Sequence, residues 1–250
     1  MLMGSYLLLI VAALAAGLIN SVAGGGMFLT FPALVFTGVP SIIANASSTV
    51  ALIPGVLASA GAYRNDFRKS VNFPFWPLFI VSVAGGVVGA LLLLYTPQST
   101  FDSVIPWLLL VATLLIAFGP RISPMLKRVI QIGPVTVVVI QFFIAIYGGY
   151  FGGAIGILML ATWTVFGLTD IHVMNANRTI MGAAANSIAA VLFIFAHKIW
   201  WPQTLVMLVF CSLGGYFGVI AAKKVRPSYV RAFVIVVSAG ITVAFFLRRH

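Results

Sequence analysis

Long apolar stretches, of 18 or more residues with at most one charge, constrain this chain more than any other feature. About 20 apolar residues in a helix cross the roughly 30 Å of hydrocarbon in a bilayer. Hydrophobic residues make up 62% of the 250 residues and charged residues 7%. This is more hydrophobic side chain than a single soluble core needs. The mean hydropathy is +1.17. The sequence therefore predicts an all-α polytopic membrane protein.

The charge distribution argues against a nucleic-acid partner, although the net charge is +11. The 14 Lys and Arg residues cluster in short connectors between apolar stretches, the pattern that sets membrane topology. The N-terminal apolar run lacks the basic region of a signal peptide, so we expect it to belong to the fold. Cys211 stands alone in an apolar stretch, and we expect neither a disulfide, a metal site nor a cofactor.

An internal repeat appears at an offset of 130 residues, where NASST (45–49) aligns with NANRT (175–179). Gly26 then falls on Gly156, and with one residue dropped AGGVVG (84–89) falls on LGGYFG (213–218). Such duplication is typical of transporters built from two halves. We therefore divide the chain into a first half at 1–120, a cytoplasmic linker at 121–134 and a second half at 135–250.

Each half is predicted to contain a first span, a Gly-rich break, a short apolar segment and three longer spans. In the first half these are 5–22, 23–26, 27–38, 41–62, 74–95 and 101–118. In the second half they are 135–151, 152–156, 157–168, 172–196, 202–222 and 229–247.

The short segment decides how the two halves are oriented. If it recrosses the membrane, the halves are inverted and ten basic residues share one side against three on the other. If it continues the first span, the halves are parallel and the split is nine against four. The distribution of basic residues favours inversion. The ten residues are Arg64, Arg68, Lys69, Arg121, Lys127, Arg128, Lys223, Lys224, Arg226 and Arg231, opposed by Lys198, Arg248 and Arg249.

The two Gly-rich breaks are candidate anion sites. An interrupted helix exposes backbone N–H groups and the positive end of the helix dipole that follows. At membrane depth such groups must line a cavity or be covered by protein. The alternative is that the glycines only allow helices to pack closely. The glycines concerned are Gly24, Gly25, Gly26, Gly153 and Gly156.

Arg178 is the one Lys or Arg well inside a predicted span, so it is a functional candidate. Its planar guanidinium suits an oxyanion with several equivalent oxygens. The alternative is snorkelling, since Arg178 lies about six residues, roughly 9 Å, from the predicted helix start. The polar neighbours that complete the predicted substrate site are Asn45, Ser47, Ser48, Thr49, Asn175, Asn177 and Thr179.

Other polar residues have a structural and a functional interpretation. Asn20 and Asn186 fall in apolar spans, where interhelical hydrogen bonding is the favoured role. Asp170 and His172 lie beside the second cluster and are candidates for proton coupling. Asp170 is also well placed to cap the following helix, the interpretation we favour.

Several absences limit the function. The three acidic residues, Asp66, Asp102 and Asp170, fall in or beside connectors, so no carboxylate relay crosses the membrane. No HExxH, GxSxG, P-loop or paired-carboxylate motif occurs, so neither hydrolysis nor ATP-driven pumping is expected. We therefore expect a protein that is not an enzyme.

The two Gly-rich breaks, each followed some twenty residues later by an Asn-containing cluster, resemble the TauE/SafE family of sulfite exporters, also called TSUP. The stretches are VAGGGMFLTFPALVFTGVPSIIANASST and GGAIGILMLATWTVFGLTDIHVMNANRT. The resemblance implies a multi-pass carrier in the cytoplasmic (inner) membrane of a prokaryote. Its substrate would be sulfite, thiosulfate or an organosulfonate. The first cluster departs from the second in having Ser48 where the second has Arg178.

The leading hypothesis is an anion exporter whose two halves rock against each other around a site between them. The alternatives are a carrier of an unrelated small anion, a membrane subunit without transport of its own, and an intramembrane enzyme. Because a negative cell interior expels anions at about 2.3 kcal/mol per charge for each 100 mV, export could be passive and electrogenic. The competing possibility is proton-linked transport, with His172 or the substrate carrying the proton.

Overall fold

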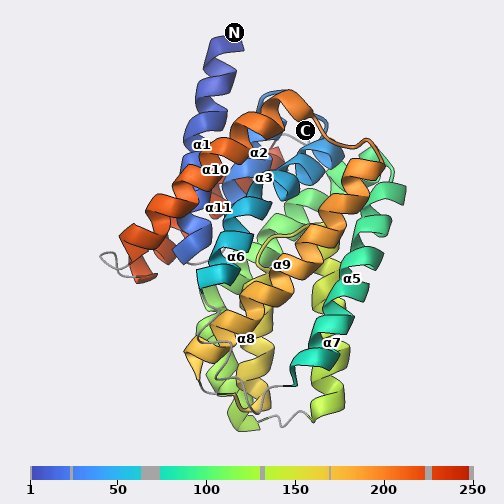
Figure 1. Cartoon of the computed structure of the whole chain (residues 1–250), viewed down its shortest axis with the longest axis vertical. Coiled ribbons are helices and arrows are strands. Elements are labelled where there is room, and N and C mark those ends of the chain that lie inside the picture. Colours follow the sequence, from blue (N-terminus) through green and yellow to red (C-terminus); the bar gives the residue numbers. More distant parts are fainter. Residues whose placement is uncertain are drawn as a thin grey trace.

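The chain folds into a helical bundle in the computed structural model, which describes residues 2–22, 25–62, 74–129, 133–168, 170–222 and 227–247. Ten helices lie within these ranges and no strand does (Figure 1). They are α1 (Leu2–Val22), α2 (Met27–Phe36), α3 (Ser41–Ala62), α5 (Phe75–Tyr95), α6 (Gln98–Val129), α7 (Pro134–Tyr150), α8 (Ile155–Phe166), α9 (Ile171–Phe195), α10 (Trp201–Ala222) and α11 (Pro227–Leu247). The prediction of an all-α protein is confirmed.

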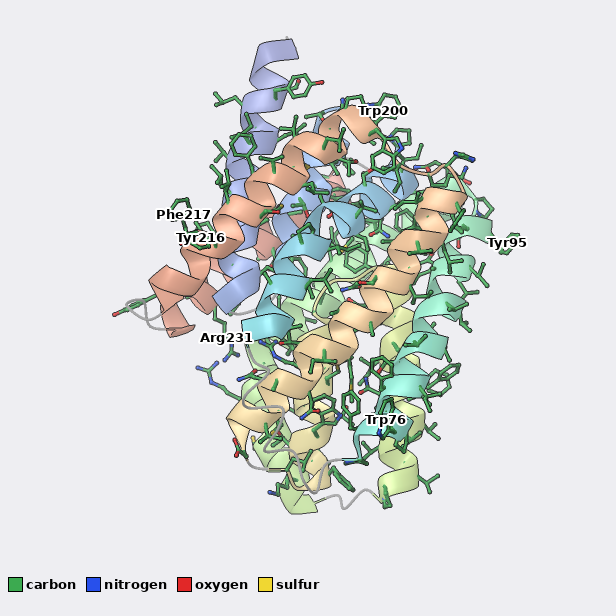
Figure 2. All side chains as sticks on the ribbon, viewed as in Figure 1. Trp76, Tyr95, Trp200, Tyr216, Phe217 and Arg231 are labelled. Atoms are coloured by element: carbon green, nitrogen blue, oxygen red, sulfur yellow. The ribbon has the colours of Figure 1, made fainter. Side chains whose placement is uncertain are left out.

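The apolar helices are long enough for a membrane protein. Four have the length and composition to cross a bilayer, within α3, α5, α6 and α9, and shorter apolar helices accompany them in the described part of the chain. On α5, the exposed Trp76 and Tyr95 lie near opposite ends, where aromatic residues of membrane helices meet the headgroups (Figure 2). They are about 28 Å apart at the helical rise of 1.5 Å per residue, which matches the hydrocarbon thickness.

Helix α6 is longer than the sequence predicted. It continues to Val129, through much of the predicted linker, although Pro120 cannot donate a backbone hydrogen bond to Ile116. Arg231 of α11 replaces that donor: its Nε donates to the carbonyl of Ile116 at 2.8 Å and its Nη2 to that of Ala117 at 2.9 Å. The cation therefore satisfies the carbonyl that the proline leaves open and holds α6 against α11.

The two sequence halves are interlocked. Helix α1 packs most extensively on α10, and α5 packs on α7, so each of these pairs joins one half to the other. Glycines make these contacts possible: a side chain at Gly17 would overlap the carbonyl of Cys211, and one at Gly214 that of Leu14. Between α5 and α7, Gly89 meets the carbonyl of Ile146 in the same way. The repeat of AGGVVG and LGGYFG thus marks two equivalent helix contacts.

We group α1, α2, α3, α10 and α11 as the α1–α10 body and α5, α6, α7, α8 and α9 as the α5–α7 body, because the 130-residue offset relates the two sets. Helix α11 nevertheless packs more extensively on α6 than on α1 or α2, so α6 and α11 form the main seam between the groups together with α3 and α9. In Figure 1 α1 and α10 lie at the upper left and α5 and α7 at the right, while α9 crosses the view from the lower left to the upper right. Between the bodies α3 packs on α9, α6 on α11, and α3 on α6.

Repeat-related helices α5 and α10 run in opposite directions along the long axis of the molecule. Helix α5 rises from Trp76 to Tyr95, whereas α10 descends from Trp200 past Tyr216 and Phe217 (Figure 2). Opposite directions are what an inverted repeat requires of equivalent helices.

Candidate functional site

Both Gly-rich breaks become sharp turns into a short helix. Gly25, with φ +95°, precedes α2, and Gly152, with φ +81°, precedes α8, a backbone region that favours glycine. No side chain caps either helix, at Gly26 for α2 or at Ala154 for α8. Turn carbonyls accept from the N–H groups of Phe28, Leu29 and Ile157. The donors that the helix starts offer a ligand are therefore the N–H groups before these, such as those of Met27 and Gly156. A Cβ at Gly26 would lie 2.7 Å from the carbonyl oxygen of Ala16, so α1 packs directly on this turn.

The two helix N-termini meet at one cavity of about 100 Å³. A single water needs roughly 10–15 Å³ of such space, so the cavity is large enough for an anion of several non-hydrogen atoms. Its lining comes from α1, α2 and α3 on one side and from the α7–α8 turn, α8 and α9 on the other. The lining residues are Asn20, Gly25, Gly26, Met27, Thr49, Leu52, Ile53, Val56, Gly152, Ala154, Ile155, Gly156, Ile157, Arg178, Thr179, Gly182 and Asn186.

Many lining positions are equivalent under the 130-residue offset. Gly26 and Gly156 form one pair, and Thr49 and Thr179 form another. Two further pairs differ between the halves: Gly182 takes the place of Leu52, and Asn186 the place of Val56. The cavity therefore lies between the two bodies, with a more polar wall on α9 and a more apolar wall on α3.

Arg178 is the only ionisable side chain among the described residues that line the cavity. It is half-buried and lies against the start of α8, where a Cβ on Gly156 would be 2.8 Å from its Nη1. The glycine thus leaves the space that the guanidinium occupies. A cation and two helix N-termini with no carboxylate in the lining favour a negatively charged ligand.

Of the predicted substrate-binding residues, six line the cavity: Gly25, Gly26, Thr49, Gly156, Arg178 and Thr179. Asn45, Ser47, Ser48, Gly153, Asn175 and Asn177 are not part of the described lining. Gly24 lies outside the described residues, as does the side chain of His172.

The first polar cluster instead connects helices. The Asn45 Nδ2 donates to the carbonyl of Tyr150, at the end of α7, at 3.0 Å. The Ser47 hydroxyl accepts from the backbone N–H of Trp200, before α10, at 2.9 Å. Ser48 and Thr30 share a hydrogen bond between α3 and α2. The Asn45 and Ser47 contacts join the first half to the second, whereas the Ser48 contact lies within the first half.

In the second cluster, hydrogen bonds lie within α9. The Asn177 Nδ2 donates to the carbonyl of Val173 at 2.8 Å, and the Thr179 hydroxyl to that of Asn175 at 2.7 Å. Asp170 accepts from the N–H of Val173 at 3.2 Å, so it caps α9 as the sequence suggested, and it is not part of the cavity lining.

Eleven of the 17 lining residues are not among the predicted substrate-binding residues, and Asn20, Gly182 and Asn186 are the most informative of them. For Asn20 and Asn186 the sequence favours interhelical hydrogen bonding, and for Gly182 it offers no role. Gly182 and Asn186 follow Arg178 by four and eight residues, which places all three on one face of α9. That spacing could have identified them.

Comparison with known proteins shows the family to which this chain belongs. The family model for the sulfite exporter TauE/SafE matches residues 9–245. The chain belongs to the TauE/SafE family. It is therefore a multi-pass membrane transporter, as the resemblance implied.

The TauE/SafE relatives cover nearly the whole chain. A "probable membrane transporter protein" of Haemophilus influenzae is 25% identical over 91% of this chain and 89% of its own length. "Probable membrane transporter protein ORF9" of a Sinorhizobium species is 25% identical over 94% and 90%. "Probable membrane transporter protein YfcA" of Escherichia coli K12 is 27% identical over 95% and 88%. No solved structure gives a significant match.

Proposed function

We propose that this transporter exports sulfite or a related sulfur oxyanion, such as thiosulfate or an organosulfonate, from the cytoplasm of a prokaryote. The observation that carries the proposal is the cavity in which Arg178 meets the N-termini of α2 and α8. The guanidinium compensates the charge of the anion, and the backbone N–H groups of the two helix starts donate to its oxygens. The repeat-equivalent Thr49 and Thr179 also line the cavity, although their hydroxyls donate to the carbonyls of Asn45 and Asn175 within their own helices.

Access to the site alternates as the α1–α10 body moves against the α5–α7 body. If one sequence half moved against the other, α1 would have to separate from α10 and α5 from α7. These helices are in backbone contact at glycines, where even a Cβ atom would overlap the neighbouring helix. Movement between the bodies changes the α3–α9 and α6–α11 contacts and opens the cavity between them. The opposite directions of α5 and α10 support inverted halves, which would give the cavity equivalent routes to the two membrane faces.

Export is driven by the membrane potential without a proton relay in the protein. The cavity lining includes no carboxylate among the described residues, and Asp170 caps α9 outside it. A bound monoanion gains about 2.3 kcal/mol for each 100 mV as it leaves a negative interior.

Proteoliposomes test this proposal when membrane potential and pH gradient are clamped separately. Labelled sulfite, thiosulfate and methanesulfonate are the probes, and protein-free liposomes are the control. The proposal predicts flux that follows the potential at equal pH. Absence of flux for all three anions would refute sulfur oxyanion transport. If a pH gradient drives uphill flux at zero potential, and His172→Gln abolishes only that drive, transport is proton-linked.

A further inference from the structure

Gly182 is a buried glycine beside which the protein leaves space. It lies within α9 and lines the cavity, yet a Cβ added there would meet no atom within 4 Å. The helix glycines at the α1–α10 and α5–α7 contacts differ, because side chains there would overlap backbone atoms. Close packing therefore does not explain a glycine at position 182.

Backbone conformation does not explain it either. Gly182 is an ordinary helical residue and is not among the glycines with positive φ. A glycine inside a helix is less stable than an alanine, because it loses more conformational freedom on folding. In the first half the equivalent position is Leu52, which also lines the cavity. The second half thus lacks a whole side chain where the first half has one.

The space beside Gly182 lies next to Arg178 along α9. Gly182 is one helical turn beyond Arg178, about 6 Å along α9. Leu52, Ile53 and Val56 line the cavity from α3, and Asn186 lines it one further turn along α9. The space beside Gly182 therefore belongs to the same cavity as Arg178 and has room for additional atoms.

We propose that Gly182 determines the size of the substrate. The oxyanion group binds at Arg178 and the helix N-termini, and the space beside Gly182 takes the substituent on sulfur, up to a short carbon chain. This inference rests on the proposed function and assigns to Gly182 the choice between sulfite and sulfonates that carry a carbon substituent. A larger side chain at position 182 restricts the site to small inorganic anions.

The test is displacement of labelled sulfite from purified protein by methanesulfonate and propane-1-sulfonate. Wild type should bind all three anions. Gly182→Ala should weaken propane-1-sulfonate about tenfold more than sulfite, because filling a pocket by one methyl group discriminates about tenfold or more. Gly182→Leu should weaken methanesulfonate as well. Gly240→Ala is the matched control, because a Cβ at this α11 glycine also meets no atom within 4 Å but lies away from the cavity lining.

A second variant acts from the opposite wall. Leu52→Phe enlarges a side chain of the lining without changing α9, and it should also weaken propane-1-sulfonate more than sulfite. If the Gly182 variants do not fold, Leu52→Phe still shows whether the size of the cavity limits the size of the substrate.

The outcomes separate this inference from the function on which it rests. Equal loss of all three anions in the Gly182 and Leu52 variants would overturn the inference and assign Gly182 to a close contact in another conformation. Wild-type protein that binds sulfite but not propane-1-sulfonate would overturn it while sulfite binding stands. Wild-type protein that binds none of the anions would refute the proposed function and the inference together.

Discussion

At the scale of single residues, the site depends on a few positions where glycine makes room for something else. Gly156 leaves space for the guanidinium of Arg178, and Gly26 lets α1 pack against the turn into α2. The two positions are repeat equivalents, but only the second half supplies a cation, because Ser48 takes the place of Arg178 in the first. The repeat therefore provides a symmetric backbone on which one side chain sets the charge.

The change Gly156→Ala should displace Arg178. A Cβ would lie 2.8 Å from the Nη1, so the guanidinium must move away from the start of α8. Affinity for sulfite should fall about tenfold or more, since a hydrogen bond to a charged group is worth about 1.5–3 kcal/mol. Calorimetric titration of purified protein measures this, with Gly240→Ala as control. Unchanged affinity would mean that the position of Arg178 against α8 does not matter for binding.

Asn45 has a structural role in this account, although the sequence placed it in the site. In Asn45→Ala the carbonyl of Tyr150 loses the donor at 3.0 Å, and a buried group left unsatisfied costs about 1–3 kcal/mol. We therefore expect a lower thermal unfolding temperature in detergent with little change in sulfite affinity. A large loss of affinity without loss of stability would return Asn45 to the substrate site.

At the scale of elements, the bounds of the helices follow from hydrophobic pattern and glycine, whereas their pairing does not. The predicted spans 41–62 and 202–222 differ from α3 and α10 by at most one residue at either end. Helix α6 continued beyond its prediction because Arg231, 111 residues after Pro120, satisfies the open carbonyl of Ile116. The roles of Ser47 and Asn45 likewise depend on Trp200 and Tyr150, distant partners that local sequence does not reveal.

The helix contact between α1 and α10 provides a prediction at this scale. Gly214→Val places a branched side chain against the carbonyl of Leu14, and overpacking of this kind costs about 1–3 kcal/mol. Thermal unfolding should therefore occur at a lower temperature than in wild type. Gly240→Val is the control and should change it little. Equal stability of the two variants would show that the α1–α10 contact is not close.

At the scale of the whole molecule, exchange of segments between the halves decides which parts can move together. The α1–α10 and α5–α7 bodies each contain helices from both halves, and the cavity lies between them. The side chains around the cavity differ most between the halves at three positions of α9. Arg178, Gly182 and Asn186 stand there, where the first half has Ser48, Leu52 and Val56. We therefore expect the motion to be nearly symmetric and the binding site to be asymmetric.

Cross-linking distinguishes the two bodies in a Cys211→Ala background. Thr113 of α6 and Thr242 of α11 face each other across the bodies, with hydroxyl oxygens 3.5 Å apart. Ser82 and Gln141 hydrogen-bond at 2.8 Å within the α5–α7 body. With cysteines at both positions and a short bifunctional reagent, the Thr113 and Thr242 pair should block flux. The Ser82 and Gln141 pair should leave flux intact, and the reverse result would contradict the assignment of the bodies.

Removing the charge in the cavity and measuring the affinity of purified protein for sulfite shows whether this cavity binds substrate. Arg178→Gln removes this charge, and Lys198→Gln removes a charge from an exposed residue outside the cavity lining. A hydrogen bond to a charged group is worth about 1.5–3 kcal/mol, so we predict a loss of affinity of about tenfold or more for Arg178→Gln. Lys198→Gln should bind as wild type does. Equal affinities in wild type and Arg178→Gln would contradict the claim that this cavity is the substrate site.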